Sequence, residues 1–248
     1  MRMKETNNLL VTKKEEKYAS SLKKLDLIPF PDGILLTENY FMLQNFQTKG
    51  FLVLDTDDKN PNYDSAFAVT TSPTMNFGCP RSLFKIQKFT KSLNSEGVTE
   101  IVTYGEKVII VSHPDCFQKT LFLQSSLIGP QSFSRFSRNQ EVLVNGEKTY
   151  NSCWIIEHPD TTFRYSLEGK AVMINEPFIL RHCATGRLLA SDLVDYYNDF
   201  GLEYEVCANN FLSTNKYQTL VSEKSGKLKI DTKTRVEKEQ NIWRFLDQ

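Results

Sequence analysis

The chain has 248 residues, of which 40% are hydrophobic, enough for the core of one large domain or two small ones. Lysine plus arginine and aspartate plus glutamate number 30 each, so the formal net charge is zero. This balance argues against a protein drawn to nucleic acid or to an anionic membrane by its overall field. A charged partner is therefore expected to meet a local patch.

The five cysteines are an odd set with neither metal-ligand spacing nor the density of a disulfide framework. Residues 1–18 are mostly polar and charged, and they lack the continuous hydrophobic region of a secretory signal. No stretch of the sequence is apolar for long enough to cross a bilayer. We therefore expect reduced thiols and a location in the cytoplasm or a compartment continuous with it.

The segment from Lys4 to Leu25 carries apolar residues at roughly helical spacing among lysines and glutamates. It predicts one helix, after which Pro29 and Pro31 impose an extended link. Two interpretations stay open, a solvated terminal helix that leans on the domain or an arm that grips a partner. We assign residues 1–34 to a helical arm and linker, and residues 35–248 to a β domain.

Beyond the linker the sequence changes to short runs of β-branched and aromatic residues separated by turn residues, which is typical of strands. Three stretches, which begin at Gly50, Glu106 and Glu176, resemble one another. Each consists of an apolar strand, a polar hairpin tip and a second apolar strand. A repeat of this length decides the architecture of the whole domain.

After a variable insert, each copy is followed by a strand with an aromatic centre, at Phe84, Trp154 or Trp243. Three copies of a four-strand unit predict an all-β fold in which three hairpins cap a closed barrel, as in a β-trefoil. The repeats would span about 35–98, 99–172 and 173–248. The three aromatic residues would then be equivalent, and we interpret both tryptophans as core residues rather than ligand-stacking ones.

The third copy, ILRHCATGRLLASD, resembles the MIR module, a β-trefoil whose repeats carry an apolar strand, a histidine, a Thr-Gly turn, a leucine and a serine. These positions are Leu180, His182, Thr185, Gly186, Leu188 and Ser191. The second copy keeps a histidine, His113, but replaces the Thr-Gly turn with PDCFQK. We expect His113 and His182 to be equivalent residues with a role in the fold, such as bonding a turn, rather than in catalysis.

Several segments, read in order, extend this resemblance. YGEKVIIVSHP, NSCWIIEHPD, ILRHCATGRLLA, YEVCAN and NIWRF are similar to the ciliary MIR-type proteins, which are microtubule inner proteins of motile axonemes. The resemblance covers about Tyr104 to Phe245. It implies a non-enzymatic structural protein in the lumen of the doublet A-tubule of the ciliary axoneme. The implied partners are α/β-tubulin and neighbouring inner proteins, and no cofactor, nucleic acid or membrane is implied.

Two loops combine aromatic residues with arginine or acidic residues, and arginine and aromatic side chains are favoured at desolvated protein interfaces. The segment QSFSRFSR, residues 131–138, carries Phe133, Arg135, Phe136 and Arg138. The segment DYYNDFGLEY, residues 195–204, carries Tyr196 and Tyr197. We predict that these six side chains bind a partner. The alternative is that they belong to exposed loops whose rings fold back on the barrel.

No spacing in the chain is typical of catalysis or metal binding. DTDDKNPN, residues 55–62, resembles the start of a calcium loop, but lysine occupies the next ligand position and Asn60 stands where glycine is required. His182 and Cys183 point to opposite faces if they lie on a strand, so they are poorly placed to share a metal ion. We expect no enzyme, no metal and no cofactor. The alternative function is a cytosolic lectin-like or peptide-binding trefoil that uses pockets between repeats.

Overall fold

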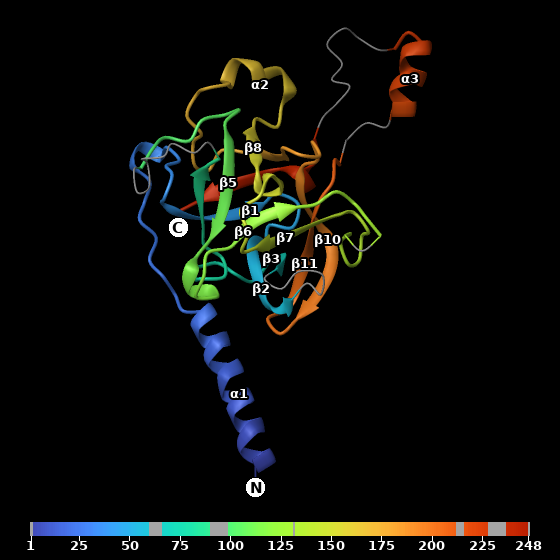
Figure 1. Cartoon of the computed structure of the whole chain (residues 1–248). Coiled ribbons are helices and arrows are strands. Elements are labelled where there is room, and N and C mark those ends of the chain that lie inside the picture. Colours follow the sequence, from blue (N-terminus) through green and yellow to red (C-terminus); the bar gives the residue numbers. More distant parts are fainter. Residues whose placement is uncertain are drawn as a thin grey trace.

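The computed structural model describes residues 2–59, 66–89, 99–130, 132–211, 216–227 and 237–247. Asn60 and Gln131, both named above, lie outside these ranges. Helix α1 (Arg2–Ser21) projects away from a body built of strands (Figure 1). The described residues contain two further helices, α2 (Thr161–Leu167) and α3 (Lys216–Lys224). The prediction of an all-β fold is confirmed.

The remaining regular secondary structure of the described residues consists of twelve strands and four short 3-10 helices. The strands are β1 (Tyr40–Asn45), β2 (Phe51–Lys59), β3 (Phe67–Ser72), β4 (Phe84–Lys88), β5 (Lys107–Ser112), β6 (Phe122–Ser125), β7 (Gln140–Asn145), β8 (Trp154–Glu157), β9 (Ile179–His182), β10 (Leu189–Asn198), β11 (Gly201–Ala208) and β12 (Trp243–Leu246). The 3-10 helices are Pro31–Gly33, Pro114–Cys116, Tyr150–Ser152 and Glu239–Asn241.

Antiparallel pairing closes part of the sheet into a barrel. β1 pairs with β4 and β12, β4 with β5, β5 with β8, and β8 with β9. Phe178, just before β9, and Trp243 of β12 close the ring by exchanging two backbone hydrogen bonds of 2.9 Å. Inside it, the ring of Phe178 stacks on that of Phe245 with centroids 4.0 Å apart. The barrel therefore encloses an aromatic core.

The strands outside this ring form three hairpins that pair with one another. The hairpins are β2–β3, β6–β7 and β10–β11. β3 pairs with β7, β7 with β11, and β11 with β3. Along the chain, each four-strand set therefore consists of one barrel strand, one hairpin and a second barrel strand. The order is repeated three times.

A backbone triangle joins the segments that precede the three sets. The N–H group of Leu35 donates to the carbonyl of Val172 (2.9 Å), that of Val172 to Val102 (2.9 Å), and that of Val102 to Leu35 (3.0 Å). All three side chains are fully buried in the main core. Each segment supplies one donor and one acceptor, so the triangle links every set to both of the others.

Phe84, Trp154 and Trp243 each begin the fourth strand of a set, and all three are fully buried in the same core. The indole N–H of Trp154 donates to the carbonyl of Leu123 in β6 at 2.9 Å. That of Trp243 donates to the carbonyl of Leu189 in β10 at 3.0 Å. Each indole thus connects a barrel strand to a hairpin through a hydrogen bond. Phe84 cannot form such a bond, because its ring has no N–H donor.

The strand register corrects one expectation about the histidines. Trp154 of β8 is paired with His182 of β9, whereas Phe84 of β4 is paired with Ser112 of β5. His113 lies one residue beyond Ser112, after the end of the strand. The predicted equivalence of His113 and His182 is therefore wrong by one residue, because side chains of consecutive residues leave a strand on opposite faces.

The two histidines also differ in burial and bonding. His182 is fully buried, and its ring nitrogens lie 2.9 Å from the hydroxyl of Thr185 and 2.9 Å from the carbonyl of Asn151. This burial lowers the pKa of His182. His113 is only partly buried, and its Nδ1 accepts a hydrogen bond from the backbone N–H of Asp115 at 3.3 Å. Each histidine bonds a turn, but only His182 does so in the core.

Candidate partner-binding surface

The two loops that the sequence predicts to bind partners lie against each other. The ring of Phe136 packs edge-on against that of Tyr196, with centroids 5.6 Å apart. Glu205 of β11 accepts hydrogen bonds from the backbone N–H groups of Phe136 (2.7 Å) and Ser137 (2.9 Å). Hydrogen bonds to a carboxylate are stronger than those between neutral groups. The β10–β11 hairpin therefore fixes the arginine loop, which we define as residues 132–138.

Within the arginine loop, both arginines lie beside phenylalanine rings. Arg138 adopts a left-handed backbone conformation with φ of 59°, and its guanidinium carbon lies 4.6 Å from the ring centroid of Phe133. The guanidinium carbon of Arg135 lies 5.6 Å from the ring centroid of Phe136. These distances are typical of cation–π contacts. Both arginines are exposed, so the loop presents two cations on an aromatic base.

The six predicted contact residues do not form one patch. Phe136 is 48% exposed, whereas Tyr196 is 4% exposed and packs its ring against the buried side of Phe136. Tyr197 is 72% exposed, and it lies opposite Leu202 in the β10–β11 register. Because Tyr196 and Tyr197 are consecutive residues of a strand, their side chains point to opposite faces. Tyr196 thus positions Phe136, and Tyr197 belongs to another part of the surface.

Sequence reasoning missed the way in which α1 is held. The ring of Tyr18 stacks on that of Phe200, with centroids 4.7 Å apart and an angle of 13° between the planes. Phe200 lies between β10 and β11, at the tip of their hairpin. The guanidinium carbon of Arg81 lies 3.5 Å from the centroid of the same ring. An exposed aromatic residue near the end of the helix was the only local signal for this contact.

Arg81 and Glu203 form a buried ion pair beside this stack. Their side chains are 1% and 0% exposed, and Arg81 Nη2 lies 3.0 Å from Glu203 Oε1. Arg81 Nε also donates to the carbonyl of Leu54 at 3.0 Å. The carboxylate of Glu203 accepts hydrogen bonds from Thr70 (2.6 Å) and Asn198 (2.7 Å). These bonds offset the cost of burying the two charges and tie β2, β3 and β11 together.

Lysines of α1 contact acidic residues of two hairpins. Lys14 Nζ pairs with Asp199 and lies 3.5 Å from Asp57. Lys17 Nζ lies 3.4 Å from Asp57 and donates to the carbonyl of Thr56. Exposed pairs of this kind stabilise weakly, but they orient the helix. The contacts fall near the C-terminal end of α1, and the rest of the helix projects from the body (Figure 1).

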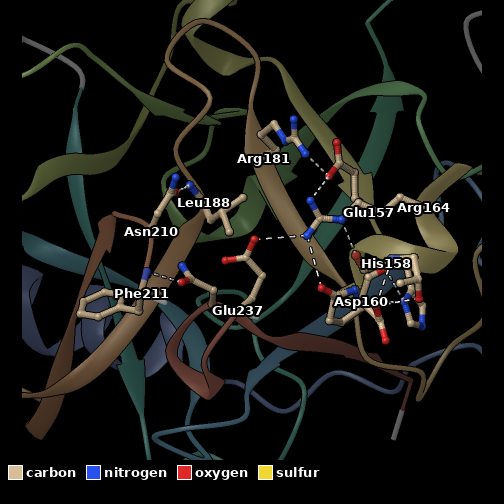
Figure 2. A network of polar contacts seen from close by, with 12 residues as sticks. Glu157, His158, Asp160, Arg164, Arg181, Leu188, Asn210, Phe211 and Glu237 are labelled. Carbon is tan, nitrogen blue, oxygen red and sulfur yellow. Dashed lines mark hydrogen bonds and ion pairs between the residues drawn. The ribbon is translucent and has the colours of Figure 1, made fainter. Parts of the chain in front are cut away.

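A third polar network fixes the short helix α2 (Figure 2). Arg164 of α2 lies 3.3 Å from the carboxylate of Glu157 and 3.3 Å from that of Glu237. Its Nε donates to the carbonyl of His158 at 2.8 Å. Arg181 of β9 contacts the same Glu157 carboxylate, as Figure 2 shows. The network joins α2 to β8, to β9 and to the chain that enters β12.

The two sequence neighbours of Arg164 in α2, Phe163 and Tyr165, are exposed aromatic residues. Phe163 is 53% and Tyr165 is 89% exposed. Arg164 is held in the network, the ring of Phe163 packs edge-on against that of His158 with centroids 5.4 Å apart, and Tyr165 projects into solvent. Residues 161–167 form a helix too short for its periodicity to be recognised in the sequence.

Asp55, in the segment that resembles the start of a calcium loop, lies in β2 and is used for internal bonding. Asp55 accepts hydrogen bonds from the backbone N–H of Asp57 (3.0 Å) and from Asn198 (3.2 Å). Within the described ranges, no group of three or more histidine, cysteine, aspartate or glutamate residues could hold a metal ion. In the same ranges no helix combines the length and the apolar character needed to span a membrane.

Comparison with known families identifies the segment that carries most of these features. Residues 107–222 match the model of the cilia- and flagella-associated protein 161-like domain. This segment of the chain, just under half of its length, is similar to that domain. The match includes the arginine loop, α2 and the β10–β11 hairpin. It confirms the resemblance to ciliary proteins that the sequence segments indicated.

Cilia- and flagella-associated protein 161 of zebrafish (Danio rerio) is 28% identical over 231 residues, which cover 86% of this chain and 75% of that protein. The mouse (Mus musculus) protein is 30% identical over 126 residues, 50% of this chain and 42% of that protein. The bovine (Bos taurus) protein is 27% identical over 124 residues, 50% of this chain and 39% of that protein. The chain thus matches less than half the length of these two mammalian proteins.

Several solved structures share the fold of this chain. The SDF2-like protein of Arabidopsis thaliana has a TM-score of 0.58 and 18% identity, over 86% of this chain and 95% of that chain. A Caenorhabditis elegans protein of unknown function has a TM-score of 0.58 and 16% identity, over 88% and 99%. The Saccharomyces cerevisiae protein O-mannosyltransferase Pmt1–Pmt2 complex has a TM-score of 0.55 and 18% identity, over 93% and 27%. At these identities the likeness concerns the fold alone.

Proposed function

We propose that this protein is a non-enzymatic structural component of motile axonemes. It is a microtubule inner protein that binds the luminal wall of the doublet A-tubule, stabilises the doublet and supports ciliary motility. Its partners are α/β-tubulin and neighbouring inner proteins. The observation that carries the proposal is the match of residues 107–222 to the cilia- and flagella-associated protein 161-like domain.

The body of the protein is, in this proposal, a MIR-like β-trefoil with repeats of about 35–98, 99–172 and 173–248. Two features support it, the cyclic pairing of the three hairpins and the backbone triangle of Leu35, Val102 and Val172. A closed barrel resists deformation and can carry contacts on its loops and hairpins. Such a scaffold suits docking on the repeating wall of a microtubule.

The arginine loop is the proposed contact with tubulin or a neighbouring inner protein. Its exposed side chains, Arg135, Phe136 and Arg138, are of the types that protein interfaces favour. Glu205 and Tyr196 already hold the loop in one conformation. Binding therefore requires little further ordering of the loop, which favours affinity.

Helix α1 is the proposed second contact, and its geometry favours the arm over a helix that leans on the domain. Its C-terminal end is fixed to the body through Tyr18, Lys14 and Lys17, whereas the remainder projects outward (Figure 1). A helix held at one end can reach a partner at a distance from the barrel. The arm and the arginine loop would then bind the wall at separate points.

The test is to tag the protein in a motile ciliated cell, extract the axonemes with detergent and then with salt, and follow the tag. We expect the protein to stay with salt-washed doublets and to recur at a regular interval along them in tomograms. Replacing Arg135 and Arg138 with alanine should weaken retention. Replacing the exposed Lys148 and Lys170 with alanine removes the same charge elsewhere and should not.

Release of the unaltered protein by mild salt would contradict luminal docking. A glycan array and a thermal-shift screen with peptides would then test the alternative, a lectin-like or peptide-binding trefoil. Retention that is unchanged in the Arg135→Ala, Arg138→Ala variant would exclude the arginine loop and leave α1 as the proposed contact.

A further inference from the structure

Cys153 and Cys183 lie opposite each other just beyond two paired strands, Cys153 directly before β8 and Cys183 directly after β9. The β8–β9 register pairs Trp154 with His182, and the two cysteines are the next pair outward. The N–H of Cys183 donates to the carbonyl of Cys153 at 2.9 Å, and the two Sγ atoms lie 2.7 Å apart. Opposite residues of antiparallel strands have Cα atoms roughly 4.5–5.5 Å apart, within the range that a disulfide spans.

The two thiols differ in access to solvent. Cys153 is fully buried, whereas Cys183 is partly exposed. The other three cysteines, Cys79, Cys116 and Cys207, are all buried. A small oxidant therefore reaches Cys183 first, and Cys153 is in place to react with the product. This is the arrangement of an attacked and a resolving cysteine.

We propose that Cys153 and Cys183 are a reversible oxidation site that a small peroxide converts into a disulfide. The thiolate of Cys183 attacks one peroxide oxygen, the O–O bond breaks, and sulfenic acid forms at Cys183. The sulfur of Cys153 then attacks the sulfenic sulfur and water leaves. With hydrogen peroxide, two thiols and one peroxide give one disulfide and two waters, and a dithiol reverses the change.

The disulfide would close a loop that contains β8, α2 and β9. The polar network of Arg164 already holds this loop together without a covalent bond (Figure 2). Because the two cysteines face each other in the reduced chain, oxidation requires no strand movement. The cross-link restricts the unfolded chain. We expect the oxidised protein to melt several degrees higher than the reduced one.

The environment of the two thiols sets the pH dependence of the reaction. Burial raises the pKa of Cys183 to about 12 and also raises the pKa of Cys153. Because the thiolate is the nucleophile, the reaction is slow at neutral pH. Far below the pKa, the thiolate fraction grows about tenfold per pH unit, so the oxidation rate should do the same between about pH 7 and 9.

The experiment uses the purified full-length chain with all five cysteines reduced. The protein is treated with hydrogen peroxide, free thiols are blocked with N-ethylmaleimide, and the products are measured by intact mass and peptide mapping. We expect a loss of about 2 Da before the thiols are blocked, two maleimide adducts fewer than on the reduced chain after blocking, and one cross-linked peptide that contains both Cys153 and Cys183. Dithiothreitol should restore both thiols.

Variants distinguish this pair from general oxidation. Cys153→Ser and Cys183→Ser should each abolish the cross-link and the rise in melting temperature. Cys207→Ser is the matched control, because it removes a buried cysteine elsewhere, and it should leave both intact. Peptide mapping of the unaltered chain tests the proposal even if a variant folds poorly. A chain that keeps all its thiols, or one that links a different pair, would overturn it.

Discussion

Tyr18 of α1 and Phe200 of the β10–β11 hairpin form a stacked pair with ring centroids 4.7 Å apart. Replacing Tyr18 with alanine should loosen the helix, because such a pair contributes roughly 0.5–1.5 kcal/mol beyond burial. Hydrogen exchange should become faster in residues 11–21 and stay unchanged in the barrel strands. Tyr165→Ala is the control, since that ring is 89% exposed. Unchanged exchange in α1 would show that the stack does not hold the helix.

The ion pairs give the docking of α1 a pH dependence with two limits. Side-chain hydrogen bonding with Asp57, and then with Lys14, lowers the pKa of Asp199 from 3.8, so the contribution of Asp199 to docking is lost as the pH falls through the lowered value. Asp199 raises the pKa of Lys14 from 10.5, so that contribution is lost as the pH rises through the raised value. Docking should be constant between about pH 5 and 9.

The anisotropy of a probe attached at Val11, which is 56% exposed, would follow this docking. Lys14→Gln should lower the anisotropy across the plateau and remove the alkaline limit. Lys148→Gln changes an exposed lysine that is distant from α1 in the sequence, and it should alter neither the anisotropy nor its alkaline limit. A pH profile that is the same with and without Lys14 would contradict the assignment.

The buried pair of Arg81 and Glu203 predicts strong coupling between two substitutions. Arg81→Met or Glu203→Gln alone should lower the free energy of unfolding by about 3–5 kcal/mol, because each removes one partner of a buried pair. The double variant should lose clearly less than the sum of the two. Urea denaturation of all four proteins measures the coupling. Additive losses would mean that the two side chains stabilise the fold independently.

The indole hydrogen bonds predict a specific cost for replacing tryptophan with phenylalanine. Trp243→Phe leaves the buried carbonyl of Leu189 without its donor and should destabilise the protein by roughly 1–3 kcal/mol. Trp154→Phe should have a similar effect through Leu123. Urea denaturation again provides the measurement. A loss below about 0.5 kcal/mol in both variants would show that the indole N–H groups add little beyond ring burial.

Glu205 should control binding without touching the partner. Glu205→Ala removes the acceptor for the backbone of Phe136 and Ser137, so the arginine loop should lose its fixed conformation. Axonemal retention should then fall although both arginines remain. Glu147→Ala, at an exposed residue, should leave retention unchanged. Normal retention of Glu205→Ala would mean that the order of the loop is not needed.

The local features of the barrel were predictable from sequence. The hydrophobic runs around Trp154 and Trp243 became β8 and β12, because such runs are formed by neighbouring residues and need no distant information. The position of His113 was not predictable in the same way. The insert PDCFQK separates it from the next strand, and the register that places Ser112 opposite Phe84 is a property of two strands.

The candidate site was predictable as two segments but not as one assembly. Phe136 and Tyr196 were each recognisable by residue type, whereas their contact depends on how two hairpins pair. Arg81 and Glu203 are 122 residues apart in the sequence, and an arginine or a glutamate by itself carries no signal for burial. The roles of Tyr196 and Glu205 as supports became apparent only from burial and bonding.

The backbone triangle of Leu35, Val102 and Val172 determines how the chain can be divided into shorter pieces. Residues 107–222 hold only one corner of the triangle, and they lack β1, β4 and β12, which complete the barrel. Expressed alone, that segment would expose Trp154 and the inner faces of its strands to water. The segment that matches the family model therefore lacks the strands that complete the barrel, and a truncated chain must keep Leu35, Val102 and Val172 to retain the triangle.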